Sequence, residues 1–251
     1  MVQLMTNNLL SLEIFSVGYS DHYVYLGAHF TDDARITSVM KLHADSCAKH
    51  VNKFGMFVRK NNNMPYSLKL KVLNAALTSS MLYGCETWLI NNIAPVAKHY
   101  HTALKLLLGV RTSTPNMLSM IECGQAEVAS IIVKRRSHFI NTFSHNASGD
   151  EPLLHALRLC QNVNSKMYQI LMHAKNYVGD PEIDSLQRLK AKCLASRSDS
   201  TRSATYLDMN PRLSVHNIYS DPAGAIPDHM RVSFTRFRLS SHRLRMVVGY
   251  T

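Results

Sequence analysis

The sequence predicts a mainly α-helical protein with a short β region near its N-terminus. Apolar residues recur at helical spacing along most of the chain after residue 33, whereas β-branched and aromatic residues are concentrated in residues 12–30. The chain has 251 residues, of which 46% are hydrophobic, so it is long enough to bury a substantial core. We therefore expect short N-terminal strands followed by a helical bundle and further helices.

Residues 12–30, with the sequence LEIFSVGYSDHYVYLGAHF, are expected to form two or three short strands. Their β-branched and aromatic side chains surround a turn cluster at residues 18–21. Thr31, Asp32 and Asp33 come next and offer oxygens that can cap a following helix.

A basic amphipathic helix is expected after this cap. Its apolar positions recur at helical spacing, at Ile36, Met40, Cys47, Val51, Phe54 and Val58. Lys41, Lys49 and Lys53 fall on the other side of the helix together with Asp45. The pattern indicates one face in the core and one basic face in solvent.

The second helix is expected to begin at Pro65, after the loop NNNMP at residues 61–65, because proline suits the first helical turn. Its apolar residues form two rows, which predicts a central position in the bundle. One row holds Leu70, Leu73, Leu77 and Met81, and the other holds Leu68, Val72 and Ala76.

Pro95 is expected to open a third helix that Gly109 closes. We expect Tyr100 and Leu104 to face inward on it. Lys98, His101 and Lys105 are expected to face outward.

Helical periodicity continues beyond Pro115 and past the cluster Lys134-Arg135-Arg136, with further runs over about 152–177 and 181–196. Residues 196–205 and 220–228 are rich in Ser, Asp, Pro and Gly and are expected to be loops or linker. The chain is accordingly divided into four segments: 1–33, 34–112, 113–196 and 197–251.

The net charge of +11 indicates a polyanionic partner, and its distribution along the chain is uneven. Residues 1–33 contain four acids and no base. Residues 34–111 contain eleven Lys and Arg against Asp45 and Glu86. A solvated basic face without a ligand is the alternative.

The sequence contains no run of 18 apolar residues and its first residues lack a signal-peptide pattern, so we expect an intracellular protein of the cytoplasm or nucleus, without a membrane partner. The five cysteines form no C-x-x-C pair and are expected to be free, buried thiols. The oligomeric state is not predicted.

Two patterns resemble metal sites. The carboxylates of Asp32 and Asp33 follow a strand and could hold Mg²⁺ for nucleotidyl transfer, but helix capping is the favoured interpretation because nothing upstream except Glu13 and Asp21 supplies a further carboxylate. His43, Cys47 and His50 share one side of a helix. Cys47 lies on the apolar row and a fourth ligand is not evident, so a buried thiol flanked by histidines is favoured over zinc.

The stretch MLYGCETWLI at residues 81–90 raises a further choice between catalysis and helix closure. Cys85 and Glu86 could pair as nucleophile and base, but no orienting partner is evident. Gly84 after a long apolar helix is more simply a C-cap, with Tyr83 and Trp88 packing around it. We therefore predict no catalytic residue, no metal and no cofactor.

The C-terminal stretch RVSFTRFRLSSHRLR interleaves arginines with apolar residues. Such a pattern suits phosphate contacts combined with base stacking, through Arg236, Arg238 and Arg243 among others. A short amphipathic helix or strand that packs its apolar side on the body is the alternative.

Four segments taken together resemble the C-terminal portion of non-LTR (LINE-type) retrotransposon reverse transcriptases: VYLGAHFTDDARI at 24–36, LKLKVLNAALTSSMLYGCETW at 68–88, LKLLLGVRTSTP at 104–115 and FRLSSHRLRMVVG at 237–249. The family has a YLG strand, a helix, the element Y-G-x-E-x-W and a helix that ends in L-G. The matching motif residues are Tyr25, Leu26, Gly27, Tyr83, Gly84, Glu86 and Trp88, with Lys71, Ala75, Leu82, Leu108 and Gly109.

The resemblance covers residues 12–115 well and 116–195 loosely, and it includes the C-terminal tail again. It implies that residues 1–33 are the end of the palm, 34–112 a helical thumb that grips the template–primer duplex, 113–196 a post-thumb region, and 197–251 a linker and basic tail. The family's Y-x-D-D aspartates and its cysteine/histidine motif have no counterpart here, and MVVG lacks the family's acidic residue. We therefore expect a truncated, noncatalytic element.

The expected function is nucleic-acid duplex binding with little sequence preference. The residues expected to contact phosphates are Lys41, Lys49, Lys53, Arg59, Lys60, Lys98, Lys105, Arg236, Arg238 and Arg243. Two alternatives stay open. One is a helical module that recruits a protein partner, and the other is a nonfunctional relic of a retroelement.

Overall fold

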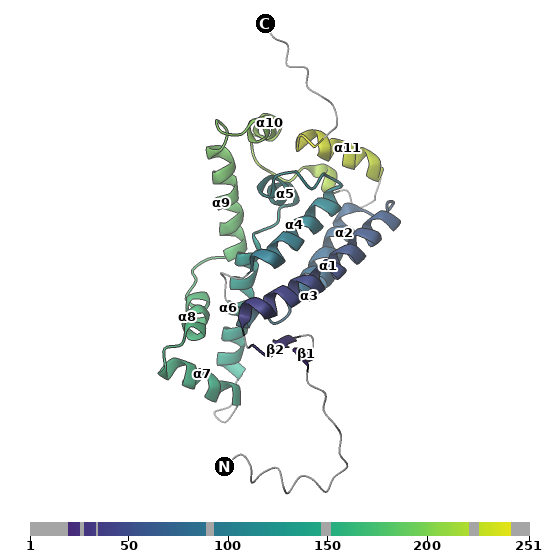
Figure 1. Cartoon of the computed structure of the whole chain (residues 1–251). Coiled ribbons are helices and arrows are strands. Elements are labelled where there is room, and N and C mark those ends of the chain that lie inside the picture. Colours follow the sequence, from purple (N-terminus) through teal and green to yellow (C-terminus); the bar gives the residue numbers. More distant parts are fainter. Residues whose placement is uncertain are drawn as a thin grey trace, which may run out of the picture.

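The computed structural model describes residues 20–25, 28–33, 35–88, 93–146, 152–220 and 226–241. The expectation of a mainly α-helical fold with short N-terminal strands is confirmed (Figure 1). Strands β1 (His22–Tyr25) and β2 (Ala28–Thr31) pair antiparallel, with His22 opposite Thr31 and Tyr25 opposite Ala28. Leu26, Gly27 and residues 12–19 of the expected β region lie outside the described residues.

The hairpin leads into the long helix α1 (Ile36–Lys60), which begins and ends within two residues of its apolar pattern. Helix α4 (Ala94–Leu108) has Pro95 in its first turn and ends at Gly109, as expected. It makes the most extensive helix contact of α1. The expected buried row of α1 is confirmed at Met40, Cys47, Val51, Phe54 and Val58.

The expected second helix is present but interrupted. Helix α2 (Tyr66–Val72) continues as a π-helical segment η1 (Leu73–Thr78) and then as the short helix α3 (Ser79–Met81). One apolar row is buried, since Leu73, Leu77 and Met81 are at most 5% exposed. The central position predicted for this helix is wrong on its other side, where Leu68 is 45% exposed and Ala76 is also exposed.

The remaining elements are helical too. They are the 3-10 turn η2 (Cys85–Thr87), α5 (Asn116–Cys123), α6 (Val128–Asn146), α7 (Pro152–Asn162), α8 (Lys166–Lys175), α9 (Pro181–Ala195), α10 (Thr201–Met209), η4 (Asn217–Tyr219) and α11 (Asp228–Arg238). Helix α6 packs against both α8 and α9, and α9 also contacts α5 (Figure 1). The linker expected over 196–205 is wrong after residue 200, because Ser200 caps α10 through a hydrogen bond from the Ser203 backbone.

A single cluster of buried apolar residues extends from Met40 of α1 to Leu239, just after α11. It includes residues from three of the four segments into which the sequence was divided. Leu239, the residue that ends α11, therefore belongs to the same core as the helices around α1. Of the five cysteines, Cys47, Cys85, Cys123 and Cys193 are buried free thiols and Cys160 is a half-buried free thiol.

Candidate nucleic-acid interface

The outer face of α1 carries a row of exposed cations. The side chains of Lys41, Lys49, Lys53, Arg59 and Lys60 are all exposed, and Asp45 is the one carboxylate in the helix. Helical periodicity places these five residues within about one third of the helix circumference. From residue 41 to residue 60 the row spans roughly 28 Å along the helix axis. We call these five residues the α1 basic face.

The opposite side of α1 is held in place by two contacts that fix which face is exposed. The ring nitrogen Nε2 of His43 lies 2.7 Å from the carbonyl oxygen of Met81, which ties α1 to α3. Near the other end, a Cβ built on Gly55 would lie 3.2 Å from Leu106, so α4 approaches α1 closely there. Because both contacts lie on the buried side, the α1 basic face points to solvent.

Only one of the two cations predicted on α4 is exposed. Lys98 is exposed as expected. The expectation that Lys105 faces outward is wrong: it is 9% exposed and its ammonium group donates a 2.7 Å hydrogen bond to the carbonyl oxygen of Thr112. The carbonyl lies in the turn after α4, so Lys105 stabilises the end of its own helix.

The arginines of the C-terminal stretch are largely structural. Arg238 is 4% exposed and forms a bidentate ion pair with Glu122, so its guanidinium is not available to a phosphate. Arg236 is exposed, and its Nε donates a 2.7 Å hydrogen bond to the carbonyl oxygen of Gly109. Arg243 lies outside the described residues. The duplex contact predicted for Arg238 is therefore wrong.

Helix α11 also packs in the opposite sense to the one expected. It is a helix, which was one of the two alternatives, but the residues it buries are Arg231, Thr235 and Arg238, while Phe237 is 53% exposed. Arg231 lies over the ring of Tyr66 and pairs with Asp228. Its Nε and Nη2 have hydrogen-bond acceptors, whereas its buried Nη1 has none among the described residues. The ion pair with Asp228 therefore offsets only part of the cost of burying this charge.

The YGCETW element closes one helix and leads into the next, as expected. Gly84 has the left-handed backbone conformation, with φ of +69°, and it links α3 to the 3-10 turn η2. Trp88 is 7% exposed and its ring makes an edge contact with His43, with 4.8 Å between centroids. Tyr83 differs from the expectation, because it is 51% exposed and does not pack into the core.

Arg136 of α6 holds this element from the other side. Its guanidinium is fully buried and donates hydrogen bonds to the carbonyl oxygens of Cys85, Glu86 and Trp88. One planar group thus donates to three backbone carbonyl oxygens of this turn. The basic cluster 134–136 was visible in the sequence, but the sequence does not reveal that Lys134 is exposed, Arg135 half-buried and Arg136 buried.

The alternative catalytic and metal sites do not assemble among the described residues. Asp33 accepts hydrogen bonds from the Ser38 hydroxyl, the Arg35 backbone and the Thr31 hydroxyl, which together lower its pKa to about 2. It therefore joins the hairpin to the first turn of α1. The N-cap residue of α1 is Arg35, which makes no side-chain capping hydrogen bond, so the cap expected at residues 31–33 is not formed in the usual way. No group of three potential metal ligands is found in the described part of the chain.

Cys85 is unsuited to act as a nucleophile in this environment. Burial, with a further contribution from Glu86, raises the pKa of its thiol to about 12. The thiol is therefore neutral at physiological pH, and a neutral thiol is a poor nucleophile. Cys47 is in the same state, because burial raises its pKa to about 12.

In comparisons with protein-family models, curated proteins and solved structures, nothing matches this chain. Within the described residues, no helix combines the length and apolar character needed to span a bilayer. Function must therefore be argued from the surfaces themselves.

Proposed function

We propose that this protein binds the sugar–phosphate backbone of nucleic-acid duplexes through the α1 basic face. The observation that carries the proposal is the row of five exposed cations against one carboxylate on a single straight helix. Cations spaced along such a row can each neutralise a phosphate and release counterions. Binding of this kind has little sequence preference, because the phosphates are the same at every step.

The resemblance to the thumb of LINE-type reverse transcriptases favours the same surface. In that family the thumb helices grip a template–primer duplex. The thumb helices would correspond, in chain order, to α1, the α2–η1–α3 helix and α4. The YGCETW element lies between the second and the third of these helices in the sequence. We infer a noncatalytic, thumb-like module whose preferred ligand is an RNA–DNA duplex.

The test is binding of a fluorescent RNA–DNA duplex between roughly 50 and 200 mM salt. The variant Lys49→Glu plus Lys53→Glu reverses two charges at the centre of the α1 basic face. The matched control, Lys166→Glu plus Lys175→Glu, makes the same change of charge at two exposed positions on α8. Both variants have the same net charge, so they separate the local surface from the overall field.

We expect the α1 variant to lose most of the affinity at low salt and to lower the log–log salt slope by about two. The α8 variant should retain most of the affinity and the wild-type slope. Equal losses of affinity in both variants would show that binding depends on the overall net charge and not on the α1 basic face. Undiminished binding by the α1 variant would show that the duplex binds elsewhere.

A second function, recruitment of a protein partner, is favoured by the N-terminal hairpin. Tyr23, Tyr25 and Phe30 are between 55% and 63% exposed, and Tyr23 lies opposite Phe30 in the strand register. The three side chains therefore share one face of the hairpin. A protein partner retained by the α1 variant and lost by Tyr25→Ser plus Phe30→Ser would support this role, and the reverse pattern would exclude it.

A further inference from the structure

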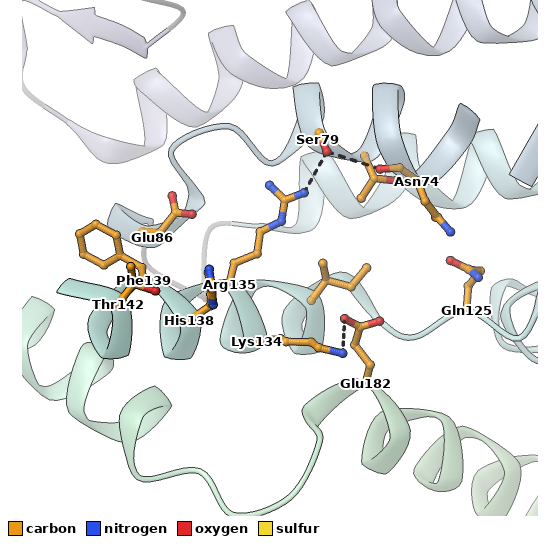
Figure 2. A pocket seen from close by; sticks show the side chains of 12 residues that line it. Asn74, Ser79, Glu86, Gln125, Lys134, Arg135, His138, Phe139, Thr142 and Glu182 are labelled. Atoms are coloured by element: carbon orange, nitrogen blue, oxygen red, sulfur yellow. Dashed lines mark hydrogen bonds and ion pairs between the residues drawn. The ribbon is translucent and has the colours of Figure 1, made fainter. Parts of the chain in front are cut away.

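A cleft of about 990 Å³ lies between the π-helical segment and α6 (Figure 2). Asn74, Thr78 and Ser79 line one wall, and Ile131, Arg135 and Phe139 line the other. The volume is that of a small-molecule site. None of the lining residues belongs to α1, so the cleft is separate from the α1 basic face.

The first wall contains a buried hydroxyl that is left without a partner. Thr78 is 5% exposed, and its Oγ1 has no hydrogen-bond partner among the described residues. It is the last residue of the π-helical segment, and π-helical turns occur often at functional sites. A buried polar atom without a partner is uncommon in folded proteins, and a ligand is one way to satisfy it.

The second wall presents a cation between an aliphatic and an aromatic side chain. Ile131, Arg135 and Phe139 follow each other at intervals of four on α6, so they form one stripe along the cleft. Arg135 donates to the carbonyl oxygen of Leu82 and to the Ser79 hydroxyl, in both cases at 3.4 Å. These are long hydrogen bonds, which an anionic ligand can replace with shorter ones.

Two carboxylates in the cleft have different surroundings. Glu182 lies 3.3 Å from the ammonium group of Lys134, so these two charges compensate each other. Figure 2 shows Glu86 at the end of the cleft where Phe139 lies, with Arg135 between this end and Asn74. An acceptor, an aromatic ring and a cation thus follow one another along the cleft.

We propose that this cleft binds a guanosine monophosphate-like ligand. The phosphate would pair with Arg135 and accept a hydrogen bond from the Thr78 hydroxyl, and the base would stack on Phe139. The adjacent N1–H and exocyclic amino group of guanine would donate to the two oxygens of the Glu86 carboxylate, which accepts only. The step between residues 135 and 139, roughly 6 Å along the helix, suits the separation of a phosphate from its base.

Isothermal titration calorimetry of the full chain with GMP tests this site, with UMP, guanosine and inorganic phosphate as comparison ligands. Uracil offers a single ring N–H instead of two adjacent donors. We expect GMP to bind at least tenfold more tightly than each of the other three. Absence of GMP binding at millimolar concentration, or phosphate binding as tight as that of GMP, would overturn the proposal.

Two variants and a control assign the binding to the cleft. Arg135→Gln should weaken GMP binding at least tenfold, whereas Arg158→Gln, at an exposed position on α7, should leave it unchanged. Thr78→Val keeps the side-chain shape and removes the unpartnered hydroxyl. Without ligand it should leave the melting temperature unchanged or raise it, and it should weaken GMP binding severalfold. Unaltered GMP affinity in both cleft variants would place the ligand elsewhere.

This inference does not depend on the proposed duplex binding. Charge reversal at Lys49 and Lys53 should remove most of the duplex affinity and leave GMP affinity unchanged. Arg135→Gln should weaken GMP binding and leave duplex binding unchanged. Failure of one proposal therefore leaves the other standing.

Discussion

Arg238 and Glu122 form a buried bidentate ion pair, in which Nε and Nη2 of the guanidinium donate to the two carboxylate oxygens at 2.8 and 3.0 Å. The hydroxyls of Tyr219 and Tyr206 also donate to these oxygens, each at 2.7 Å. Glu122 lies on α5, whereas its partners come from α10, η4 and α11. One carboxylate on α5 thus holds three elements of the C-terminal region, α10, η4 and α11.

Arg238→Met should destabilise the protein strongly, because it leaves the fully buried Glu122 carboxylate without its counter-charge. We expect a loss of about 3–5 kcal/mol in the free energy of unfolding, measured by urea denaturation. Glu122→Gln combined with Arg238→Met should cost less than the sum of the single changes, since neither charge is then left alone. Additive costs would contradict a direct coupling. Arg212→Met, at an exposed position, is the control.

This network shows why the C-terminal stretch could not be interpreted from its sequence. The alternation of arginine with phenylalanine was clear, but it fits a nucleic-acid surface and a packed helix equally well. The decision depends on Glu122, which lies 116 residues from Arg238 and carries no local signal. In contrast, Gly109, Pro95 and the apolar row of α1 are local signals, and each of them located its element correctly.

The candidate duplex surface was predictable for a similar reason. Lys41, Lys49 and Lys53 occupy the side of α1 opposite its apolar row, so helical periodicity alone places them in solvent. Lys105 lies on a helix too, but its environment is set by the turn that follows α4, where the Thr112 carbonyl meets its ammonium group. The position of that turn depends on tertiary packing, which periodicity does not encode.

Arg136 should be irreplaceable even by lysine. A guanidinium can donate to the carbonyl oxygens of Cys85, Glu86 and Trp88 together, whereas a single ammonium group presents its donors from one point. We expect Arg136→Lys to cost about 2–3 kcal/mol, because buried carbonyls lose their partners. Arg188→Lys, at an exposed position on α9, should change the free energy of unfolding by less than about 0.5 kcal/mol. Chemical denaturation compares the two, and equal stability would refute the role of Arg136.

Gly84 and Gly109 provide a matched pair for separating backbone strain from steric conflict. Both have φ of +69°, but a Cβ on Gly84 meets nothing within 4 Å, whereas one on Gly109 would lie 2.8 Å from Val232 of α11. Gly84→Ala should therefore cost about 1 kcal/mol for the left-handed conformation alone. Gly109→Ala should cost about 2–4 kcal/mol.

The second-site change Val232→Ala identifies the source of the difference. Placed in the Gly109→Ala background, it should recover the part of the loss that comes from the steric conflict. Thermal unfolding monitored by circular dichroism compares the wild type, Gly84→Ala, Gly109→Ala and the double variant Gly109→Ala plus Val232→Ala. If Val232→Ala only adds to the destabilisation, the contact between α4 and α11 differs from the one described.

Stability should fall as the pH is lowered below about 6.5, the ordinary pKa of histidine. Burial, partly offset by the hydrogen bond to the Met81 carbonyl, lowers the pKa of His43 in the folded state, and burial together with His43 lowers that of His29. The unfolded chain then binds protons more readily than the folded one. The stabilisation is complete above about 6.5 and is lost as the pH falls toward the folded-state pKa.

His43→Gln should flatten this pH dependence, because glutamine can donate to the Met81 carbonyl but does not titrate. The difference between pH 7.5 and pH 5 in the free energy of unfolding should be smaller in this variant than in the wild type. His155→Gln, at an exposed position on α7, should leave the profile unchanged. Urea titrations at five or six pH values are sufficient. A profile that His43→Gln leaves as steep as before would assign the acid sensitivity to other residues and would remove the His43–Met81 contact as its source.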